Sequence, residues 1–200
     1  ADALILHLNP LQEAVQPQGD PDWRGLYGRI ERLVAQLPVP VLVKEVGNGL
    51  SAKVAQRLAD CGVAALDVAG AGGTSWSEVE AHRQTEALKK RIAHSFRDWG
   101  IPTALALLEI RRLLPDLPLV ASGGIRNGLD VAKAIRLGAD VVGMAAPALH
   151  AVSQGQAQAV VDTFRAVIEE LRIAAFCTGS ANLARLRQAT LRRQDTWDPL

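Results

Sequence analysis

The stretch LPLVASGGIRNGLDVAKAIRLGADVVGMAAP, Leu117–Pro147, decides the fold class. An apolar run, Leu117–Gly124, ends in two adjacent glycines, and a helical pattern follows over Leu129–Leu137. Gly138 stops that helix, and a second apolar run covers Ala139–Pro147. Short, near-continuously apolar runs are typical of parallel strands that are buried on both faces. The stretch therefore predicts a strand, a helix and a second strand parallel to the first.

The same pattern recurs along the whole chain. Three further apolar runs end in Gly, Pro or Asn, and they cover Ala3–Leu8, Pro40–Gly47 and Ala64–Gly73. Helical patterns cover Gly25–Leu37, Ser51–Cys61, Pro102–Leu114 and, with a break at Thr178-Gly179, about Gln156–Arg193. Ser51 and Ser180 are the expected N-terminal caps of the helices that follow them. Alternation of strands and helices predicts a right-handed parallel α/β fold.

Polar and glycine-rich segments follow every predicted strand. Function at the carboxyl ends of many strands is typical of a TIM (β/α)8 barrel, whereas a doubly wound sheet usually carries its glycine fingerprint after the first strand. Five strands cannot close an eight-stranded barrel. We therefore expect one domain over residues 1–200: the last five βα units of a TIM barrel over 1–153, then C-terminal helices and a tail over 154–200.

The chain begins with Ala-Asp-Ala, directly before a predicted strand. We therefore expect the true N-terminus and roughly three βα units, about 100 or more residues, to precede it. The fragment alone should expose open strand edges and fold poorly.

Composition excludes several partners. The formal net charge is +1, from 22 basic and 21 acidic residues, so no strong field should draw the chain to nucleic acid or to a membrane surface. The sequence contains no apolar run of membrane-spanning length and no signal peptide. Cys61 and Cys177 are isolated from each other, which indicates reduced, buried thiols in a cytoplasmic protein.

Two glycine-rich loops predict a phosphate site. Gly123-Gly124 and Met144-Ala145-Ala146 close the last two predicted strands, where TIM barrels often hold a phosphate near a helix N-terminus. Glycines would let several N–H groups approach one anion. The alternative is a tight strand-to-helix turn with nothing bound. Asp130 is expected to belong to the following helix start.

The loop AGAGGTSW and the strand VLVKEV add to this site. Thr74 and Ser75 supply hydroxyls for the same phosphate or a sugar-like chain, unless the loop is flexible and contacts no ligand. Lys44 lies inside an apolar strand, where an unpaired ammonium is costly. It could hold a delocalised anion at the barrel mouth, or pair with Glu45 or Glu13.

The stretch HLNPLQE crowds polar side chains at the end of one strand. His7, Asn9, Gln12 and Glu13 occur within it. The carboxylate of Glu13 suits Mg²⁺ if a substrate diphosphate and waters complete the shell. The alternative is a cluster of cap and loop hydrogen bonds. The residues alone predict a phosphate-bearing ligand and a candidate Mg²⁺ site, and they do not name the reaction.

A resemblance to a known family indicates which reaction this is. The combination of HLNPLQE, VLVKEVGNGLS, DVAGAGGTSW, FRDWGIPT and ASGGIRNGLDVAKAIRLGAD resembles the flavin-dependent, type 2 isopentenyl-diphosphate isomerases. The likeness runs from Ala3 to about Arg193 and covers the C-terminal part of the family's barrel. It implies conversion of isopentenyl diphosphate to dimethylallyl diphosphate by protonation and deprotonation. It also implies reduced FMN, Mg²⁺, NADPH as reductant and a homo-oligomer.

The resemblance assigns roles residue by residue. Gln12 resembles the family's substrate-contacting glutamine, and Glu13 resembles its Mg²⁺ ligand. His7 and Asn9 lie in the same substrate pocket. Contacts to FMN are implied for Lys44, at the pyrimidine edge of the flavin, for Thr74, and for the phosphate cradle formed by Gly123, Gly124, Ile125, Arg126, Ala145 and Ala146. The family often has a serine near Ala69 and a glycine near Ala146.

Two other classes are alternatives. One is another FMN-dependent TIM-barrel oxidoreductase, of the α-hydroxy-acid oxidase or nucleotide dehydrogenase type. The oxidase should carry a histidine with an arginine after a late strand, and the dehydrogenase a cysteine in the loop that here reads GAGGTSW. Only His150 follows a late strand closely. The other alternative is an inactive phosphate-binding fragment.

Overall fold

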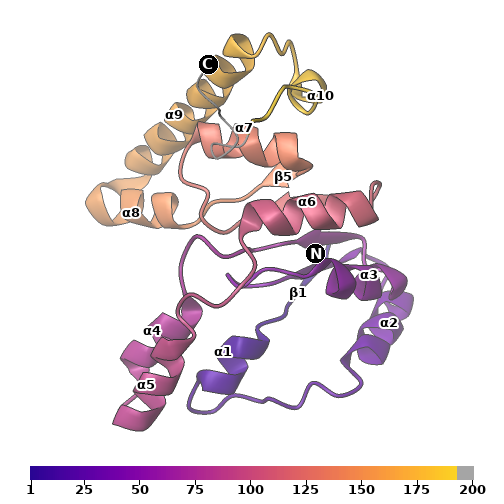
Figure 1. The fold of residues 1–200 in the computed structure, drawn as a ribbon, viewed down its shortest axis with the longest axis vertical. Helices are drawn as coiled ribbons and strands as arrows, with labels where there is room; N and C mark the ends of the chain where they lie inside the picture. The colour runs from indigo at the N-terminus through magenta and orange to yellow at the C-terminus, as the bar shows by residue number, and fades with distance from the viewer. Residues whose placement is uncertain (193–200) are drawn as a thin grey trace, which may run out of the picture.

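The centre of the molecule is a parallel five-stranded sheet (Figure 1). This computed structural model describes residues 1–192. The strands are β1 (Leu4–His7), β2 (Val41–Lys44), β3 (Ala65–Asp67), β4 (Leu119–Ala121) and β5 (Val141–Val142). They pair in chain order. A doubly wound sheet reverses its strand order at a switch point, and this sheet does not. The predicted five consecutive βα units of a TIM barrel are confirmed.

Helices connect and follow the strands. They are α1 (Pro10–Val15), α2 (Leu26–Gln36), α3 (Ala52–Asp60), α4 (Trp76–Arg83), α5 (Ala87–Ser95), α6 (Thr103–Leu113), α7 (Gly128–Leu137), α8 (Ala146–Gln154), α9 (Gln156–Cys177) and α10 (Leu183–Leu186). The predicted ranges of α2, α3, α6 and α7 agree with the structure to within a residue or two. The sequence analysis assigned no element to α1, α4, α5 or α8.

Local chemistry at the helix ends explains several boundaries. The Ser51 hydroxyl accepts a hydrogen bond from the Val54 N–H at 3.3 Å, so the predicted cap of α3 is confirmed. The prediction for Ser180 is wrong, because the side chain of Asn182 caps α10. Ser180 instead closes α9, where its N–H donates to the carbonyl of Ala175 at 2.8 Å. The predicted helical end at Arg193 lies outside the described residues, and α10 already ends at Leu186.

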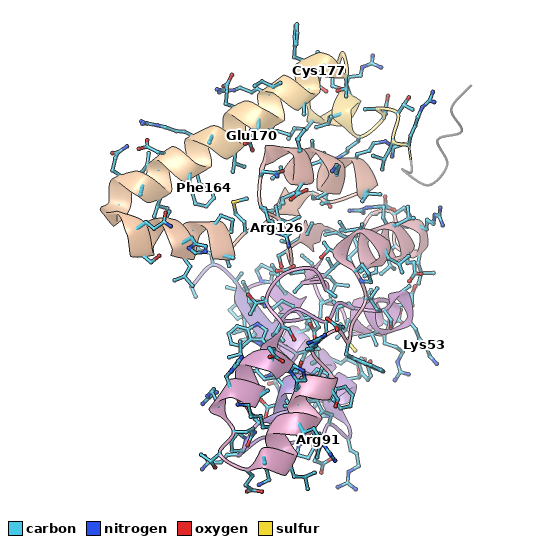
Figure 2. All side chains as sticks on the ribbon, turned by 60° about the vertical axis from the view of Figure 1, so that its left-hand side comes forward. Lys53, Arg91, Arg126, Phe164, Glu170 and Cys177 are labelled. Carbon is cyan, nitrogen blue, oxygen red and sulfur yellow. The ribbon has the colours of Figure 1, made fainter. Side chains whose placement is uncertain are left out.

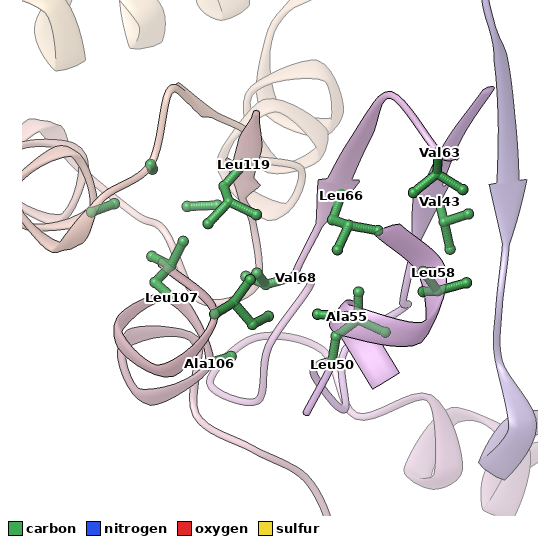
Figure 3. Packing of buried hydrophobic residues seen from close by; sticks show 14 of the residues in the cluster. Val43, Leu50, Ala55, Leu58, Val63, Leu66, Val68, Ala106, Leu107 and Leu119 are labelled. Carbon is green, nitrogen blue, oxygen red and sulfur yellow. The ribbon is translucent and has the colours of Figure 1, made fainter. Parts of the chain in front are cut away.

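The core lies between the sheet and the helices that pack on it (Figure 3). Val43, Leu66 and Leu119 come from three neighbouring strands, and Leu58 and Leu107 come from α3 and α6. All five are fully buried. Burying one such side chain contributes about 1.5–3 kcal/mol. This core holds the carboxyl ends of the strands, and hence the loops that follow them, in fixed positions.

The C-terminal helices pack against α7. The backbone N–H of Gly128, at the start of α7, donates to the carboxylate of Glu170 on α9 at 2.6 Å (Figure 2). A side chain at Gly128 would collide with the backbone of α9. The close approach therefore requires glycine there, and it fixes the N-terminus of α7 beside the loop that precedes it.

The helices α4 and α5 form a hairpin that projects away from the sheet beside α1 (Figure 1). Figure 2 labels Arg91 on this hairpin and Cys177 at the opposite extreme of the molecule. Cys177 is exposed and Cys61 is partly buried, so the expectation of buried thiols is wrong for Cys177, which lies at the uncovered end of α9. Within residues 1–192, no helix is both long and apolar enough to span a bilayer.

Candidate cofactor and substrate site

A cavity of about 560 Å³ lies at the carboxyl ends of β2, β3, β4 and β5. Residues from all four of the following loops line it. The lining includes every residue that the sequence analysis assigned to the cofactor, namely Lys44, Thr74, Gly123, Gly124, Ile125, Arg126, Ala145 and Ala146. The structure therefore brings these eight residues together around one space. Their contacts with FMN stay a prediction.

Gly123 and Gly124 have a structural role that the sequence analysis did not foresee. Both adopt positive φ, at 93° and 78°. A side chain at Gly123 would collide with the carbonyl of Gly70, and one at Gly124 would meet the carbonyl oxygen of Gly72 at 2.6 Å. The glycines thus let the loop after β4 pack directly on the loop after β3. The guanidinium of Arg126 joins the two loops by donating to the carbonyl of Gly72 at 2.8 Å.

The donor set around the cavity fits a phosphate. Among the described residues, the backbone N–H groups of Gly123, Gly124, Ile125, Met144 and Ala145 donate to no protein acceptor. Helix α7 starts immediately afterwards, and its positive dipole end favours an anion. Uncommitted amides beside a helix start are the groups that bind phosphate in other proteins. The residues present therefore suit the phosphate of FMN.

Three titratable side chains form a row across neighbouring strand ends. His7 pairs in register with Lys44, and Lys44 pairs in register with Asp67. Paired residues of parallel strands point to the same face of the sheet, and neighbouring strands lie about 4.8 Å apart. The Lys44 ammonium donates to the backbone carbonyl of Glu45 at 2.6 Å. Within residues 1–192 it forms no ion pair with Glu45 or Glu13, so that alternative for Lys44 is wrong.

Burial shifts the pKa values of two residues in this row, His7 and Asp67. It lowers the pKa of His7, and the charge of Lys44 lowers it further, while Glu45 and Glu13 act in the opposite direction. Burial raises the pKa of Asp67, although hydrogen bonds from Ser122 and Ala69 and the charge of Lys44 oppose the shift. The Ser122 hydroxyl donates to Asp67 at 2.8 Å, and the Ala69 N–H donates to the same oxygen at 3.1 Å.

Glu45 organises the turn that follows Lys44. One oxygen of its buried carboxylate accepts four successive backbone N–H groups, those of Val46, Gly47, Asn48 and Gly49, at 2.6, 2.8, 2.6 and 3.2 Å. This carboxylate folds back on its own loop instead of facing the cavity. It fixes the backbone on the C-terminal side of Lys44, and with it the carbonyl that Lys44 contacts.

The residues of HLNPLQE lie at the end of β1. His7, Asn9 and Glu13 line a second hollow of about 410 Å³. The Asn9 amide donates to Gln12 at 3.2 Å and to Glu13 at 3.0 Å. Gln12 turns towards α4, where its amide donates to Glu80 at 3.0 Å. The structure therefore joins Asn9, Gln12 and Glu13 in one hydrogen-bonded cluster, which the sequence analysis had given as an alternative to ligand binding, and His7 lies beside it in the hollow.

Glu13 is the residue that the family resemblance assigns to Mg²⁺. Its carboxylate accepts from Asn9, from the Gln16 amide at 2.7 Å and from the Asp20 N–H at 2.8 Å. Within residues 1–192 no group of three or more His, Cys, Asp or Glu side chains could hold a metal ion. A single carboxylate suits Mg²⁺ when a phosphate-bearing substrate and waters supply the remaining oxygens.

Sequence reasoning missed three polar residues of this region, Asp67, Glu80 and Ser122, and it considered Glu45 only as a possible ion-pair partner of Lys44. Asp67 could have been found, because ALDVA places a carboxylate in an apolar strand just as VLVK places a lysine. Glu80 is fully buried and pairs with Arg83 at 2.9 Å. It lies in the unassigned segment over α4, so no periodicity pointed to it.

The described part of the chain also contains a larger hollow of about 800 Å³. It lies between α1, α2, α3 and the end of α5, and aromatic side chains such as Trp23, Tyr27, Phe96 and Trp99 line it. Glu45 is its one charged lining residue, and its carboxylate is committed to its own loop. The groups that could carry chemistry lie in the other two spaces.

Comparison with known proteins gives the family. The model of the FMN-dependent dehydrogenase family matches residues 7–193. The chain belongs to this family. Two relatives are named isopentenyl-diphosphate delta-isomerase. The one from Stutzerimonas stutzeri (strain A1501) is 64% identical over 190 residues, 95% of this chain and 55% of the relative. The one from Synechocystis sp. is 59% identical over 198 residues, 99% of this chain and 55% of the relative. The chain thus spans about half the length of these relatives.

Solved structures agree on the fold. A lactate oxidase of Pediococcus acidilactici superposes with a TM-score of 0.69 at 18% identity, over 95% of this chain and 53% of that chain. A GMP reductase of Trypanosoma brucei superposes with a TM-score of 0.62 at 23% identity, over 94% of this chain and 39% of that chain. At these identities the likeness concerns the fold alone.

Proposed function

We propose that the protein is an isopentenyl-diphosphate delta-isomerase that works with reduced FMN and Mg²⁺. The observation that carries the proposal is the cavity of about 560 Å³, which gathers all eight residues that the family resemblance assigns to FMN. The similarity to isomerases at 64% and 59% identity supports the same reaction. Isopentenyl and dimethylallyl diphosphate would be substrate and product.

Bound reduced FMN would supply an electron-rich ring that stabilises positive charge at the alkene and can carry a proton. The protein supplies the field around that ring. The Lys44 ammonium would stabilise the negative charge of a reduced flavin at its pyrimidine edge. The uncommitted amides of Gly123, Gly124 and Ile125 hold the phosphate, with Arg126 and the start of α7 behind them. Thr74 contributes a hydroxyl at the rim.

The substrate would lie next to the end of β1. Glu13 would bind Mg²⁺ together with the diphosphate, and Asn9 holds the Glu13 carboxylate in place. Burial and the charge of Lys44 lower the pKa of His7, which favours its neutral form, so it would act as a hydrogen-bonding group rather than a cation. Gln12 is fixed by Glu80 and Asn9, so it would orient the substrate rather than transfer a proton.

Three further parts of the proposal rest on the family resemblance. NADPH would reduce the flavin, and the protein would act in the cytoplasm. The chain would assemble as a homo-oligomer, which the exposed apolar side chains of the C-terminal helices support. They include Leu149, Val152, Ile173 and Phe176.

The oxidoreductase alternatives fit the cavity less well. Among the described residues, neither a histidine nor a cysteine lines the cavity of about 560 Å³. His150 is exposed on α8. A hydroxy-acid oxidase needs a base beside the flavin, and a nucleotide dehydrogenase of this fold needs a nucleophilic thiol.

The test uses the full-length gene product. The protein is loaded with FMN, reduced anaerobically with dithionite, and incubated with Mg²⁺ and isopentenyl diphosphate. We expect NMR to detect dimethylallyl diphosphate, and we expect its formation to stop when the flavin is left oxidised. A folded, flavin-loaded protein that makes no product would refute the isomerase assignment. Hydroxy acids and purine nucleotides would then be the substrates to screen.

The same assay tests the site residues. Glu13→Gln should raise the Mg²⁺ concentration needed for half-maximal activity, whereas Glu31→Gln, on the exposed face of α2, should leave it unchanged. If the FMN-loaded protein has the same activity with and without Mg²⁺, the proposed role of the metal is wrong.

A further inference from the structure

Lys44 and Asp67 carry opposite charges on neighbouring strands, and within the described residues they form no ion pair with each other. They pair in register at the ends of β2 and β3, and both line the cavity of about 560 Å³. Among the described residues no ion pair joins them, because Lys44 donates to the carbonyl of Glu45 and Asp67 accepts from Ser122 and Ala69. Both charges therefore remain available to a ligand in the cavity.

Asp67 is also the sole carboxylate among the described residues that line this space. The other charged lining residues are Lys44 and Arg126. Arg126 is exposed and is bound to the carbonyl of Gly72 at the phosphate end. Glu45, the residue directly after Lys44, is committed to four backbone N–H groups of its own loop. The negative charge at the ring end of the cavity therefore comes from Asp67.

The hydrogen bonds of Asp67 fix its carboxylate without neutralising its charge. Ser122 and Ala69 both donate to Oδ1, and within residues 1–192 Oδ2 accepts no hydrogen bond. Serine and amide donors stabilise the ionised form, whereas a cation in contact would cancel its field. The position of this carboxylate is thus set by β3 and β4 together.

We propose that Asp67 acts against Lys44 on a flavin bound in this cavity and thereby lowers its reduction potential. The inference rests on the proposed flavin site. Reduction adds negative charge to the ring. Lys44 favours that charge, and a carboxylate held one strand away disfavours it. Asp67 would thus act on the flavin through its charge, and the reduction potential of the bound flavin measures this effect.

The experiment measures the midpoint potential of FMN bound to the full-length protein, by anaerobic spectroelectrochemistry at pH 7. Asp67→Asn removes the charge and keeps an oxygen that can accept from Ser122 and Ala69. We expect the reduction equilibrium to shift about tenfold towards the reduced form, which is about 30 mV upward for a two-electron couple. Asp67→Ala should shift it in the same direction.

Two control variants separate charge from structure. Ser122→Ala removes the hydroxyl that contacts Asp67 but no charge, so its shift should be clearly smaller. Asp116→Asn makes the same chemical change at an exposed residue that precedes β4, at the opposite end of the sheet, and should leave the potential unchanged. Circular dichroism and the spectrum of the bound flavin establish that each variant is folded and loaded.

The outcomes are distinct. An unchanged or lowered potential in folded, loaded Asp67→Asn and Asp67→Ala proteins overturns the inference and leaves the isomerase assignment standing. Equal shifts in Asp67→Asn and Ser122→Ala also overturn it, because polarity rather than charge would then act. Failure of the wild-type protein to bind FMN refutes the flavin site, and the inference with it.

Discussion

At the scale of single residues, two carboxylates neighbour Lys44 and have different roles: Glu45 follows it in the chain, and Asp67 pairs with it across two strands. Glu45 satisfies backbone N–H groups of a turn, whereas Asp67 leaves one oxygen towards an open cavity. Neutralising Glu45 should therefore lower the free energy of unfolding, whereas neutralising Asp67 should not.

Glu45→Gln should destabilise the protein by about 2–4 kcal/mol, since a hydrogen bond to a charged group contributes about 1.5–3 kcal/mol and several would be weakened at once. Urea unfolding of wild type and variant measures the difference. Glu31→Gln, which removes an exposed carboxylate from α2, should change the stability by less than about 0.5 kcal/mol. If the Glu45→Gln protein were as stable as wild type, the turn would not depend on this carboxylate.

Asp67→Asn should be at least as stable as wild type at pH 7. Because burial raises its folded pKa above the ordinary value of 3.8, Asp67 contributes favourably only when protonated. That contribution is fully present below pH 3.8 and is lost as the pH rises through the folded pKa. The stability advantage of the variant should therefore disappear on acidification. Thermal unfolding at several pH values measures it, and a variant that is less stable at pH 7 contradicts the sign.

At the scale of elements, the loop after β4 depends on glycine through contact with another loop. Gly123→Ala should cost about 2–4 kcal/mol, because a residue with a side chain is strained at positive φ and the added carbon would overlap the carbonyl of Gly70. Gly28→Ala is the matched control. It lies inside α2 with room for the added carbon and should stabilise the protein by about 0.5–1 kcal/mol. Denaturant midpoints measure both changes.

The sequence predicted this region's elements better than its contacts. Strand ends and the helices α2, α3, α6 and α7 follow from apolar periodicity and from Gly or Ser at their boundaries. Gly123-Gly124 was recognised as a position where something approaches the backbone, but the neighbour is another loop as well as the open cavity. That packing joins segments about fifty residues apart, which no local pattern encodes. The hairpin of α4 and α5 was missed because it follows a glycine-rich loop and has a weak apolar stripe.

At the scale of the whole molecule, the two ends of the sheet have separate roles. The carboxyl ends of the strands carry the cavity. At the other end, Arg111 on α6 donates to the carbonyls of Leu114, Pro115, Leu117 and Gly138 and to the carboxylate of Asp140. Arg187, beside α10, pairs with the same carboxylate at 2.8 Å. This network joins α6, α7 and the C-terminal segment beneath the sheet.

Arg111→Lys should lower the free energy of unfolding by about 2–4 kcal/mol, since several hydrogen bonds of about 1 kcal/mol each are lost and lysine cannot reach all the acceptors. The midpoint potential of bound flavin should stay at the wild-type value, because the change lies at the far end of the strands. Arg112→Lys, at the exposed neighbouring position, should change neither quantity. A shifted potential in Arg111→Lys would show that the two ends are coupled.

The hairpin of α4 and α5 leaves the sheet and returns to it at one place. Ala71 and Pro102 form a parallel bridge, and the N–H of Ala71 donates to the carbonyl of Ile101 at 2.9 Å. The segment between them is therefore a closed excursion whose two ends already touch. Such a segment can be exchanged for one of different length without moving the strands on either side. This segment also carries Glu80, which holds Gln12. Exchanging the hairpin while keeping residues 72–76, which lie at the cavity, therefore offers a route to new substrate shapes on an unchanged cofactor platform.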